Sequence, residues 1–234
     1  MKSKNYFARR KSFVFAMMAL IFCGQAQSQL IQYAPGHPPM ISGVAIEPLE
    51  KHQVPDFLKS QARQEIQQMK AQGFVHASEE AVDYLDRAKA DTGKFLRPWN
   101  EIRPRLKIIP ATVRGTPLEA SGVKVLGGIP GGISSAEGWT AITRLLLEPK
   151  LGLMMLDETD YVASGGGLLM IEEAINQEVN GRPAILRIKT SPKGKSITEL
   201  TWATDQKIYT LSANRSVKGD TLQAMLDFAK NLHD

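Results

Sequence analysis

The sequence of 234 residues has one cysteine, few aromatic residues (7%) and no apolar run of membrane-spanning length. The cysteine, Cys23, lies within the first 28 residues. A mature chain that begins after residue 28 therefore contains no thiol, which excludes disulfides, thiolate metal sites and a cysteine nucleophile. The longest uncharged apolar run, residues 12–23, is shorter than the roughly 20 residues that cross a bilayer as a helix. The mature chain is therefore predicted to have no transmembrane span.

The mature chain also lacks an excess of charge of either sign. Lys and Arg number 29 against 24 Asp and Glu, and the chain is 43% hydrophobic and 23% charged, as in ordinary globular proteins. Residues 1–28 hold no acid and the following bases: Lys2, Lys4, Arg9, Arg10 and Lys11. The remaining bases and acids are equal in number, so no basic surface is predicted and nucleic acid is not expected as a partner.

Residues 1–28 have the pattern of a secretory signal peptide. A basic segment precedes the apolar run, and Ala26 and Ser28 are the small residues expected before a cleavage site after residue 28. The protein is therefore predicted to be periplasmic or secreted.

Two other export routes would use the same segment. Cys23 stands where a lipoprotein would be acylated, but Phe22 is larger than the small residue usual before that cysteine, so lipoprotein anchoring is the less favoured alternative. Arg9 and Arg10 form a twin-arginine pair, but Ser12 displaces the phenylalanine usual after such a pair. The secretory signal peptide remains the preferred interpretation.

Beyond residue 28 the pattern predicts an extended linker over 29–55, a helical region over 56–117 and an α+β domain over 118–234. Apolar residues recur at three- and four-residue spacing over 56–72, and Gly73 follows as a stop. A second helix is expected to begin at Ser78 and run to about residue 91. These two helices predict an N-terminal helical hairpin.

The last domain is predicted to be chiefly sheet. A Gly-rich turn is expected over 122–132 and a helix over 134–149, while 168–178 suits either a helix or a strand. Alternating or bounded apolar runs predict strands over residues 152–162, 184–189, 197–203 and 207–213. An apolar stripe predicts a last helix over 221–232. The expected fold class is α+β, with an N-terminal helical hairpin, then an antiparallel β-sheet and a C-terminal helix packed on one face.

Four pieces near the end of the chain follow a recurrent order. They are a V-x-G-x-x-A strand over 179–184, an L-x-W strand over 200–202, a Y-x-L-S strand over 209–212 and a helix that ends at Leu232. This part resembles a domain of unknown function found in exported bacterial lipoproteins and anti-sigma-factor-like envelope proteins, which is similar to lipoprotein-carrier-like sheets. The resemblance covers about a quarter of the chain and implies a sheet with a terminal helix, not a catalytic site.

Metal sites and cofactors are not predicted. The four histidines, His37, His52, His76 and His233, have no metal-ligand spacing. The acidic segment 157–160 lacks the remaining positions of a calcium loop, which favours a solvated acidic turn.

No catalytic residue is predicted either. The Gly-rich segment 127–132 lacks the Lys-Ser/Thr ending of a phosphate loop. Ser134, Ser135 and Ser164 have neighbouring glycines but no G-x-S-x-G elbow.

A candidate binding surface is predicted on the last strands. Arg187 and Lys189 belong to a basic cluster with Lys193 and Lys195, and the aromatic pair Trp202 and Tyr209 flanks the next turn. This surface would suit an envelope protein or a small apolar or anionic ligand.

The preferred hypothesis is a non-enzymatic binding or interaction module of the bacterial envelope, with the sheet near 168–213 facing its ligand. One alternative is a periplasmic hydrolase that uses segments 127–135 and 157–160, which requires that a histidine join them. The other is a structural accessory subunit that docks through its N-terminal helices.

Overall fold

The computed structural model describes residues 43–90 and 96–234. The expected signal peptide, Cys23, His37 and most of the predicted linker lie outside the described residues. So does the end of the second predicted helix, at residue 91.

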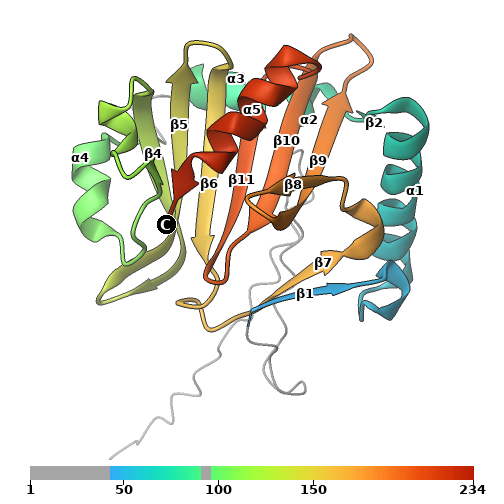
Figure 1. Ribbon diagram of the computed structural model, residues 1–234, viewed down its shortest axis with the longest axis horizontal. Helices are drawn as coiled ribbons and strands as arrows, with labels where there is room; N and C mark the ends of the chain where they lie inside the picture. The colour runs from blue at the N-terminus through green and yellow to red at the C-terminus, as the bar shows by residue number, and fades with distance from the viewer. Residues whose placement is uncertain (1–42, 91–95) are drawn as a thin grey trace, which may run out of the picture.

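One large sheet forms the centre of the molecule (Figure 1). Its strands, in spatial order, are β2 (Val75–His76), β9 (Arg182–Thr190), β10 (Ser196–Ala203), β11 (Lys207–Ala213), β6 (Gly152–Asp160), β5 (Gly138–Glu148) and β4 (Lys124–Ser135). A further strand, β8 (Gln177–Val179), pairs with β9. All pairs are antiparallel except β2 with β9, which is parallel.

Two small strand pairs lie beside this sheet. The parallel pair consists of β1 (Val44–Glu47) and β7 (Leu168–Ile171), and the antiparallel pair consists of β3 (Thr112–Val113) and β12 (Leu232–His233). Short 3-10 helices cover Leu49–Lys51, Arg103–Arg105, Leu118–Ala120 and Glu172–Ala174.

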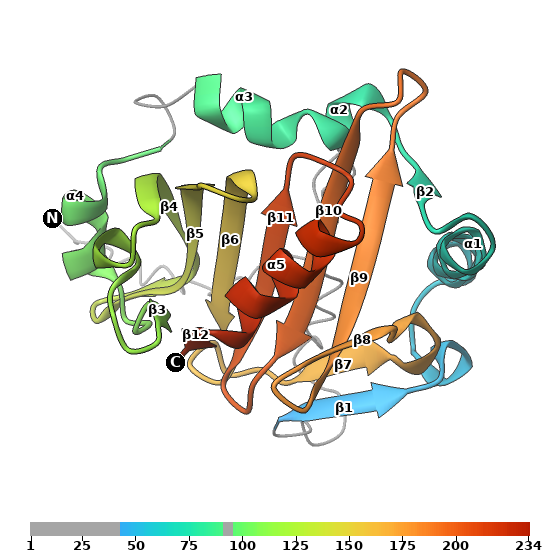
Figure 2. The same cartoon turned by 45° about the horizontal axis from the view of Figure 1, so that its top comes forward.

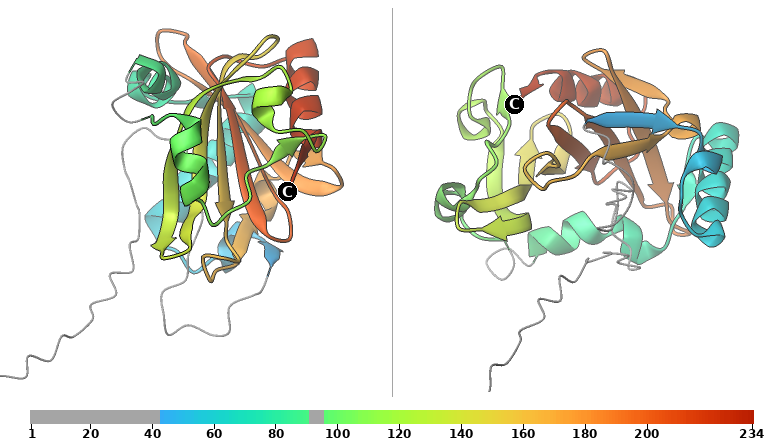
Figure 3. Two further views of the ribbon diagram at one scale, coloured as in Figure 1. Left: turned by 90° about the vertical axis from the view of Figure 1, so that its left-hand side faces the viewer. Right: turned by 90° about the horizontal axis from the view of Figure 1, so that it is seen from below.

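Helices lie on both sides of the sheet. The last helix, α5 (Asp220–Lys230), crosses one face, while α2 (Glu79–Val82) and α3 (Tyr84–Ala90) lie on the other side at one end of the strands (Figures 2 and 3). The longest helix, α1 (Asp56–Gln72), runs beside the β2 edge, and the short α4 (Trp99–Ile102) lies beside β4 at the opposite edge (Figure 2).

The predicted fold class is wrong. The described chain is mostly β with a large mixed sheet, and no N-terminal helical hairpin is confirmed. The two helical segments expected to form the hairpin are separated by β2, which joins the main sheet beside β9. They therefore pack on different parts of the sheet, with α1 beside β2 and α3 against β5 and β6.

The predicted helix over 134–149 is also wrong, because this segment forms the end of β4 and all of β5. Strand β5 is buried on both faces, so its apolar residues run almost continuously and do not alternate, and such a run cannot be told from a helix by period. The Gly-rich segment 127–132, expected to be a turn, lies within β4. Two irregularities interrupt that strand's register with β5.

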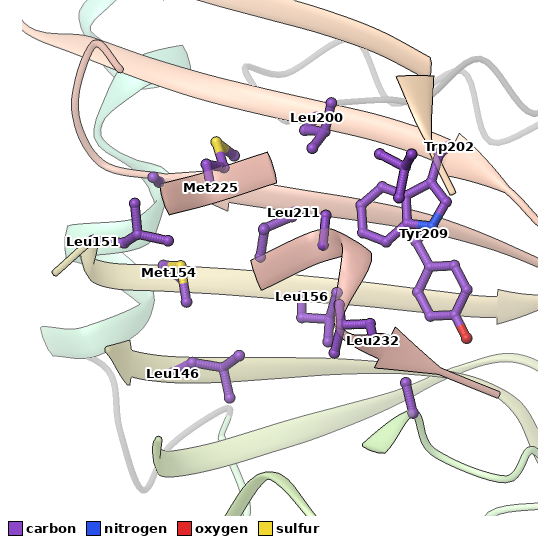
Figure 4. Close-up of a cluster of buried hydrophobic side chains, with 14 of the residues drawn as sticks. Leu146, Leu151, Met154, Leu156, Leu200, Trp202, Tyr209, Leu211, Met225 and Leu232 are labelled. Atoms are coloured by element: carbon purple, nitrogen blue, oxygen red, sulfur yellow. The ribbon is translucent and has the colours of Figure 1, made fainter. Parts of the chain in front are cut away.

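The largest apolar core lies between the sheet and α5 (Figure 4). Met225 and Ala229 of α5 are fully buried there, against strand residues that include Leu156, Leu200 and Leu211. The predicted strands over 184–189, 197–203 and 207–213 and the predicted last helix are confirmed by β9, β10, β11 and α5. Burial of the α5 apolar stripe explains why this helix was readable from the sequence.

Gly138 is required where β5 begins. Its φ is +120°, and a Cβ there would lie 2.5 Å from the carbonyl oxygen of Arg105 and 2.8 Å from the amide nitrogen of Lys107. Gly138→Ala is therefore expected to lower the free energy of unfolding by about 2 kcal/mol, measured by urea denaturation. The matched control is Gly165→Ala, where φ is also positive (+73°) but no atom lies within 4 Å. Equal losses in both variants would show that the backbone contact at Gly138 is unimportant.

Candidate functional site

The sheet face opposite α5 carries a row of polar side chains between two apolar clusters. At one end of the strands, Val82 and Leu85 of the α2–α3 region pack on β5, β6 and β10. At the other end, Leu168 and Met170 of β7 pack near Ala203 and Ile208. We call the side chains between these clusters the polar belt: Thr143, Asp157, Thr210, Thr201, Ser212 and Glu199.

The register places the belt on one face. Directly opposed residues in antiparallel strands share a face, and Asp157 of β6 is opposed by Thr143 of β5 and by Thr210 of β11. Thr210 is in turn opposed by Thr201 of β10. One row of the belt thus crosses four neighbouring strands. Two hydrogen bonds connect side chains of this row. Thr143 donates to Asp157 Oδ1, and the Thr201 and Thr210 hydroxyls lie 3.1 Å apart.

The second row contains the remaining belt residues. Ser212 of β11 is opposed by Glu199 of β10, and Glu199 by Arg187 of β9. The Glu199 side chain is 4% exposed and accepts a hydrogen bond from Lys189 Nζ at 3.0 Å. Arg187 pairs instead with Glu65 of α1 at 3.3 Å. Every charge in this row therefore has an oppositely charged partner.

Two buried hydroxyls at the belt are neighbours and have no hydrogen-bond partner within the described chain other than each other. They are Tyr84 Oη, from α3, and Ser212 Oγ. The residues are 8% and 0% exposed, respectively. Burial raises the pKa of Tyr84 well above its usual value, the charges of Glu199 and Asp157 raise it further, and a hydrogen bond with Ser212 opposes this. The two hydroxyls can therefore satisfy each other and do not by themselves require a ligand.

Asp157 is the belt carboxylate without a cation. Among residues 43–90 and 96–234 its side chain has one hydrogen-bond partner, Thr143, and no ion pair. Burial raises the pKa of Asp157 to about 6, the Thr143 hydrogen bond opposes this, and the negative charges of Glu199 and Glu158 add to it. The group therefore changes charge near neutral pH, where many binding and proton-transfer groups operate.

A second set of buried charges lies on the α5 side of the sheet and has a structural explanation. Arg144 and Glu158, with side chains 1% and 0% exposed, form an ion pair. Arg144 also donates to the carbonyl of Ala111 at 3.0 Å, and Glu158 accepts from the Ala111 amide at 2.6 Å. The Trp99 ring lies over the guanidinium, 5.3 Å from its centroid. This network fixes the segment before β3 to the sheet.

A neighbouring set joins the end of the described chain to β11. Lys207 Nζ donates to the Ile109 carbonyl at 2.7 Å and lies 3.1 Å from the Asp234 carboxylate, which also accepts from the Tyr209 hydroxyl. Burial raises the pKa of Asp234, but the hydrogen bond from Tyr209 and the charge of Lys207 outweigh this and bring it below its usual value. The polar atoms of this set satisfy one another, so they do not require a ligand.

The four residues of the predicted binding surface are divided between the two faces. Trp202 and Tyr209 are directly opposed and stacked, with ring centroids 5.0 Å apart, as expected for a pair that pins the register. They are 3% and 2% exposed, respectively, and belong to the core below α5 (Figure 4), so they present no surface. Arg187 and Lys189 lie beside the belt on the other face and are neutralised by acidic partners.

The segments considered for hydrolysis approach each other without a histidine. The Ser164 hydroxyl donates to Thr140 Oγ1 at 2.9 Å, and the same oxygen accepts from the Ile133 amide. No described histidine shares a hydrogen bond with these residues: His52 contacts the Glu47 carbonyl, and His76 and His233 lie in β2 and β12. No cluster of three metal-ligating side chains occurs within the described residues.

The sequence interpretation missed most of the belt. Asp157 was noticed as part of an acidic turn, whereas it lies inside β6, and the hydroxyls of Thr143, Thr201 and Thr210 carried no signal of their own. Their relation depends on cross-strand register, which links positions up to 67 residues apart in the numbering. The available signal was confined to β10 and β11, where Glu199 and Thr201, and Thr210 and Ser212, stand two positions apart and therefore lie on one face of the strand.

Comparison with models of known protein families, with curated proteins and with solved structures finds no match. Among the helices of the described part of the chain, none has the length and apolar character needed to cross a membrane.

Proposed function

We propose that this protein is an exported bacterial envelope protein that binds a small polar ligand at the polar belt without transforming it. The observation that carries the proposal is the Asp157 carboxylate, which has one hydrogen-bond partner, Thr143, and no ion pair among the described residues. A partly buried carboxylate without a cation is unfavourable in the free protein, so such a group is expected to persist where a ligand compensates for it.

The surroundings of the belt support binding over catalysis. Its hydroxyls and carboxylates can accept or donate several hydrogen bonds, and apolar clusters border it on two sides. Neither a nucleophile–base pair nor a histidine accompanies it among the described residues, and the export of the protein is inferred from the signal-peptide pattern of residues 1–28.

Native mass spectrometry of the protein, purified from its own exported fraction, tests the proposal. We expect a population that retains a non-covalently bound small molecule. Thr210→Val removes the hydroxyl directly opposite Asp157 with little change in side-chain volume, so this variant is expected to lose the bound mass. The matched control is Ser134→Val on the exposed end of β4, which should retain it. Bare wild-type protein, or equal retention by both variants, would contradict binding at the belt.

A further inference from the structure

We infer that the ligand of the polar belt carries a primary ammonium group, and that the Asp157 carboxylate holds this group. The inference rests on the proposed function, because it names the class of ligand for the same site. It follows from the balance of charges, the acceptors around Asp157 and the apolar side chain at the end of its row.

Among the described residues of the belt face, one charge is uncompensated. Glu199 pairs with Lys189, and Arg187 pairs with Glu65, so the charges on β9 and β10 cancel. Asp157 has no cation within hydrogen-bonding reach among residues 43–90 and 96–234. A partly buried carboxylate such as Asp157 is stabilised by an opposite charge, and a ligand cation can supply it.

The remaining belt groups suit an ammonium ion better than a metal ion or an anion. An ammonium group has three donors, and the hydroxyl oxygens of Thr143 and Thr210, directly opposite Asp157 on the neighbouring strands, are able to accept hydrogen bonds beside the carboxylate. The backbones of Asp157 and Glu199 are separated by β11, roughly 10 Å at about 4.8 Å per strand, and no cluster of three metal-ligating side chains occurs among the described residues. An anion would meet no free cation among the described belt residues.

An alkyl chain attached to the ammonium group also has a place to lie. Ile129 of β4 is directly opposed to Thr143, so it extends the Asp157 row toward the sheet edge. Its side chain is one of the exposed large hydrophobic groups, at 37%. A ligand with an aliphatic carbon chain would cover this side chain while its charge meets Asp157.

Protons and the ammonium group compete for the same carboxylate. The titratable groups around Asp157 are Tyr84 of α3, Glu158 of β6 and Glu199 of β10, while β5 and β11 present only hydroxyls. Since Asp157 has a pKa of about 6 in the free protein, its protonation weakens ligand binding below that pH.

The test is an NMR chemical-shift titration of the full protein with n-butylammonium, in phosphate buffer to avoid amine buffers. The comparison ligands are butyltrimethylammonium, which keeps the charge but has no N–H donors, and butyrate. We expect n-butylammonium to bind at least about tenfold more tightly than either, and its affinity to fall about tenfold for each pH unit below about 6.

Asp157→Asn is expected to weaken n-butylammonium binding by at least about tenfold and to remove its pH dependence. The matched control, Asp205→Asn, changes an exposed carboxylate that pairs with Arg182, and it should bind as the wild type does. The wild-type pH series serves as an independent readout of the same carboxylate. Undiminished binding by Asp157→Asn, or pH-independent wild-type binding, overturns the assignment of the ammonium group to Asp157.

Failure of this inference is distinguishable from failure of the proposed function. A bound molecule in the native mass spectrum that contains no amine, together with no response to n-butylammonium, overturns the ammonium assignment and leaves belt binding intact. Bare protein in the native mass spectrum together with no shift at belt residues for any of the three compounds overturns both.

Discussion

Arg144→Met is expected to lower the free energy of unfolding by about 3 to 5 kcal/mol. The substitution leaves the Glu158 carboxylate fully buried with its charge unpaired, and it removes the hydrogen bond to the Ala111 carbonyl. Urea denaturation at neutral pH measures the loss. Arg182→Met is the matched control, because that arginine makes an exposed ion pair with Asp205 and its loss should cost at most about 1 kcal/mol.

A double substitution separates the charge from the packing. Replacing both Arg144 and Glu158 by apolar residues of similar size removes the unpaired charge, so Arg144→Met with Glu158→Leu should recover most of the stability lost in the single variant. If Arg144→Met lowers the free energy of unfolding no more than Arg182→Met does, the buried Arg144–Glu158 ion pair does not stabilise the fold more than an exposed pair.

Asp157→Asn is expected to stabilise the ligand-free protein at pH 7.5 by up to about 3 kcal/mol. The folded-state pKa of Asp157 is raised from 3.8 to about 6, so the folded protein holds this proton more tightly than the unfolded chain does. The free energy of unfolding therefore falls by about 1.4 kcal/mol per pH unit as the pH rises from about 4 to about 6. Above about pH 6 it no longer changes. Asparagine does not ionise and avoids this loss.

Urea denaturation of wild type and variant at pH 4.5 and pH 7.5, in phosphate or acetate without amines, measures the effect. The two proteins should differ little at the lower pH and most at the higher one. The control Asp205→Asn has the opposite expectation, because its salt bridge with Arg182 lowers the pKa of Asp205 and its loss is mildly destabilising. A variant no more stable than wild type at pH 7.5 would contradict the inference that the Asp157 carboxylate is unpaired and disfavoured by its burial.

A gain of stability on substitution of Asp157 would support a ligand-binding role for this residue. Groups that bind ligands often remain at a cost to the free protein, and ligand binding recovers that cost. Loss of n-butylammonium binding together with a gain of stability in the same variant would identify Asp157 as such a group. Replacement of a residue with only a structural role would instead lower the free energy of unfolding of the protein.

The sequence predicted the local elements of the last third of the chain and little of their assembly. Strands β9 to β11 alternate and end at clear turns, and α5 has a single apolar stripe, so local pattern was sufficient there. Strand β5 was misread because both of its faces are buried. The two-residue β2 has no readable pattern, because its place depends on pairing with β9, more than 100 residues later.

The candidate site was harder to predict for the same reason. Trp202 and Tyr209 were readable as a cross-strand pair, but the sequence did not reveal that α5 covers them. The basic residues Arg187 and Lys189 suggested an anionic ligand until the structure placed Glu65 and Glu199 beside them. Net charge at a site depends on residues brought from distant elements, and the linear sequence does not show which ones meet.

The strand order has a consequence for the folding pathway. Strands β4 to β6 and strands β9 to β11 each form a meander joined by short turns, whereas β6 and β11 pair across the long intervening segment 161–206. Loop closure makes such non-local pairing slow, so we expect the joining of the two meanders to be the late step. Asp157 and Thr210 face each other across this seam. The ligand site therefore arises only when both halves have met, and a ligand would stabilise the completed sheet without assisting either half.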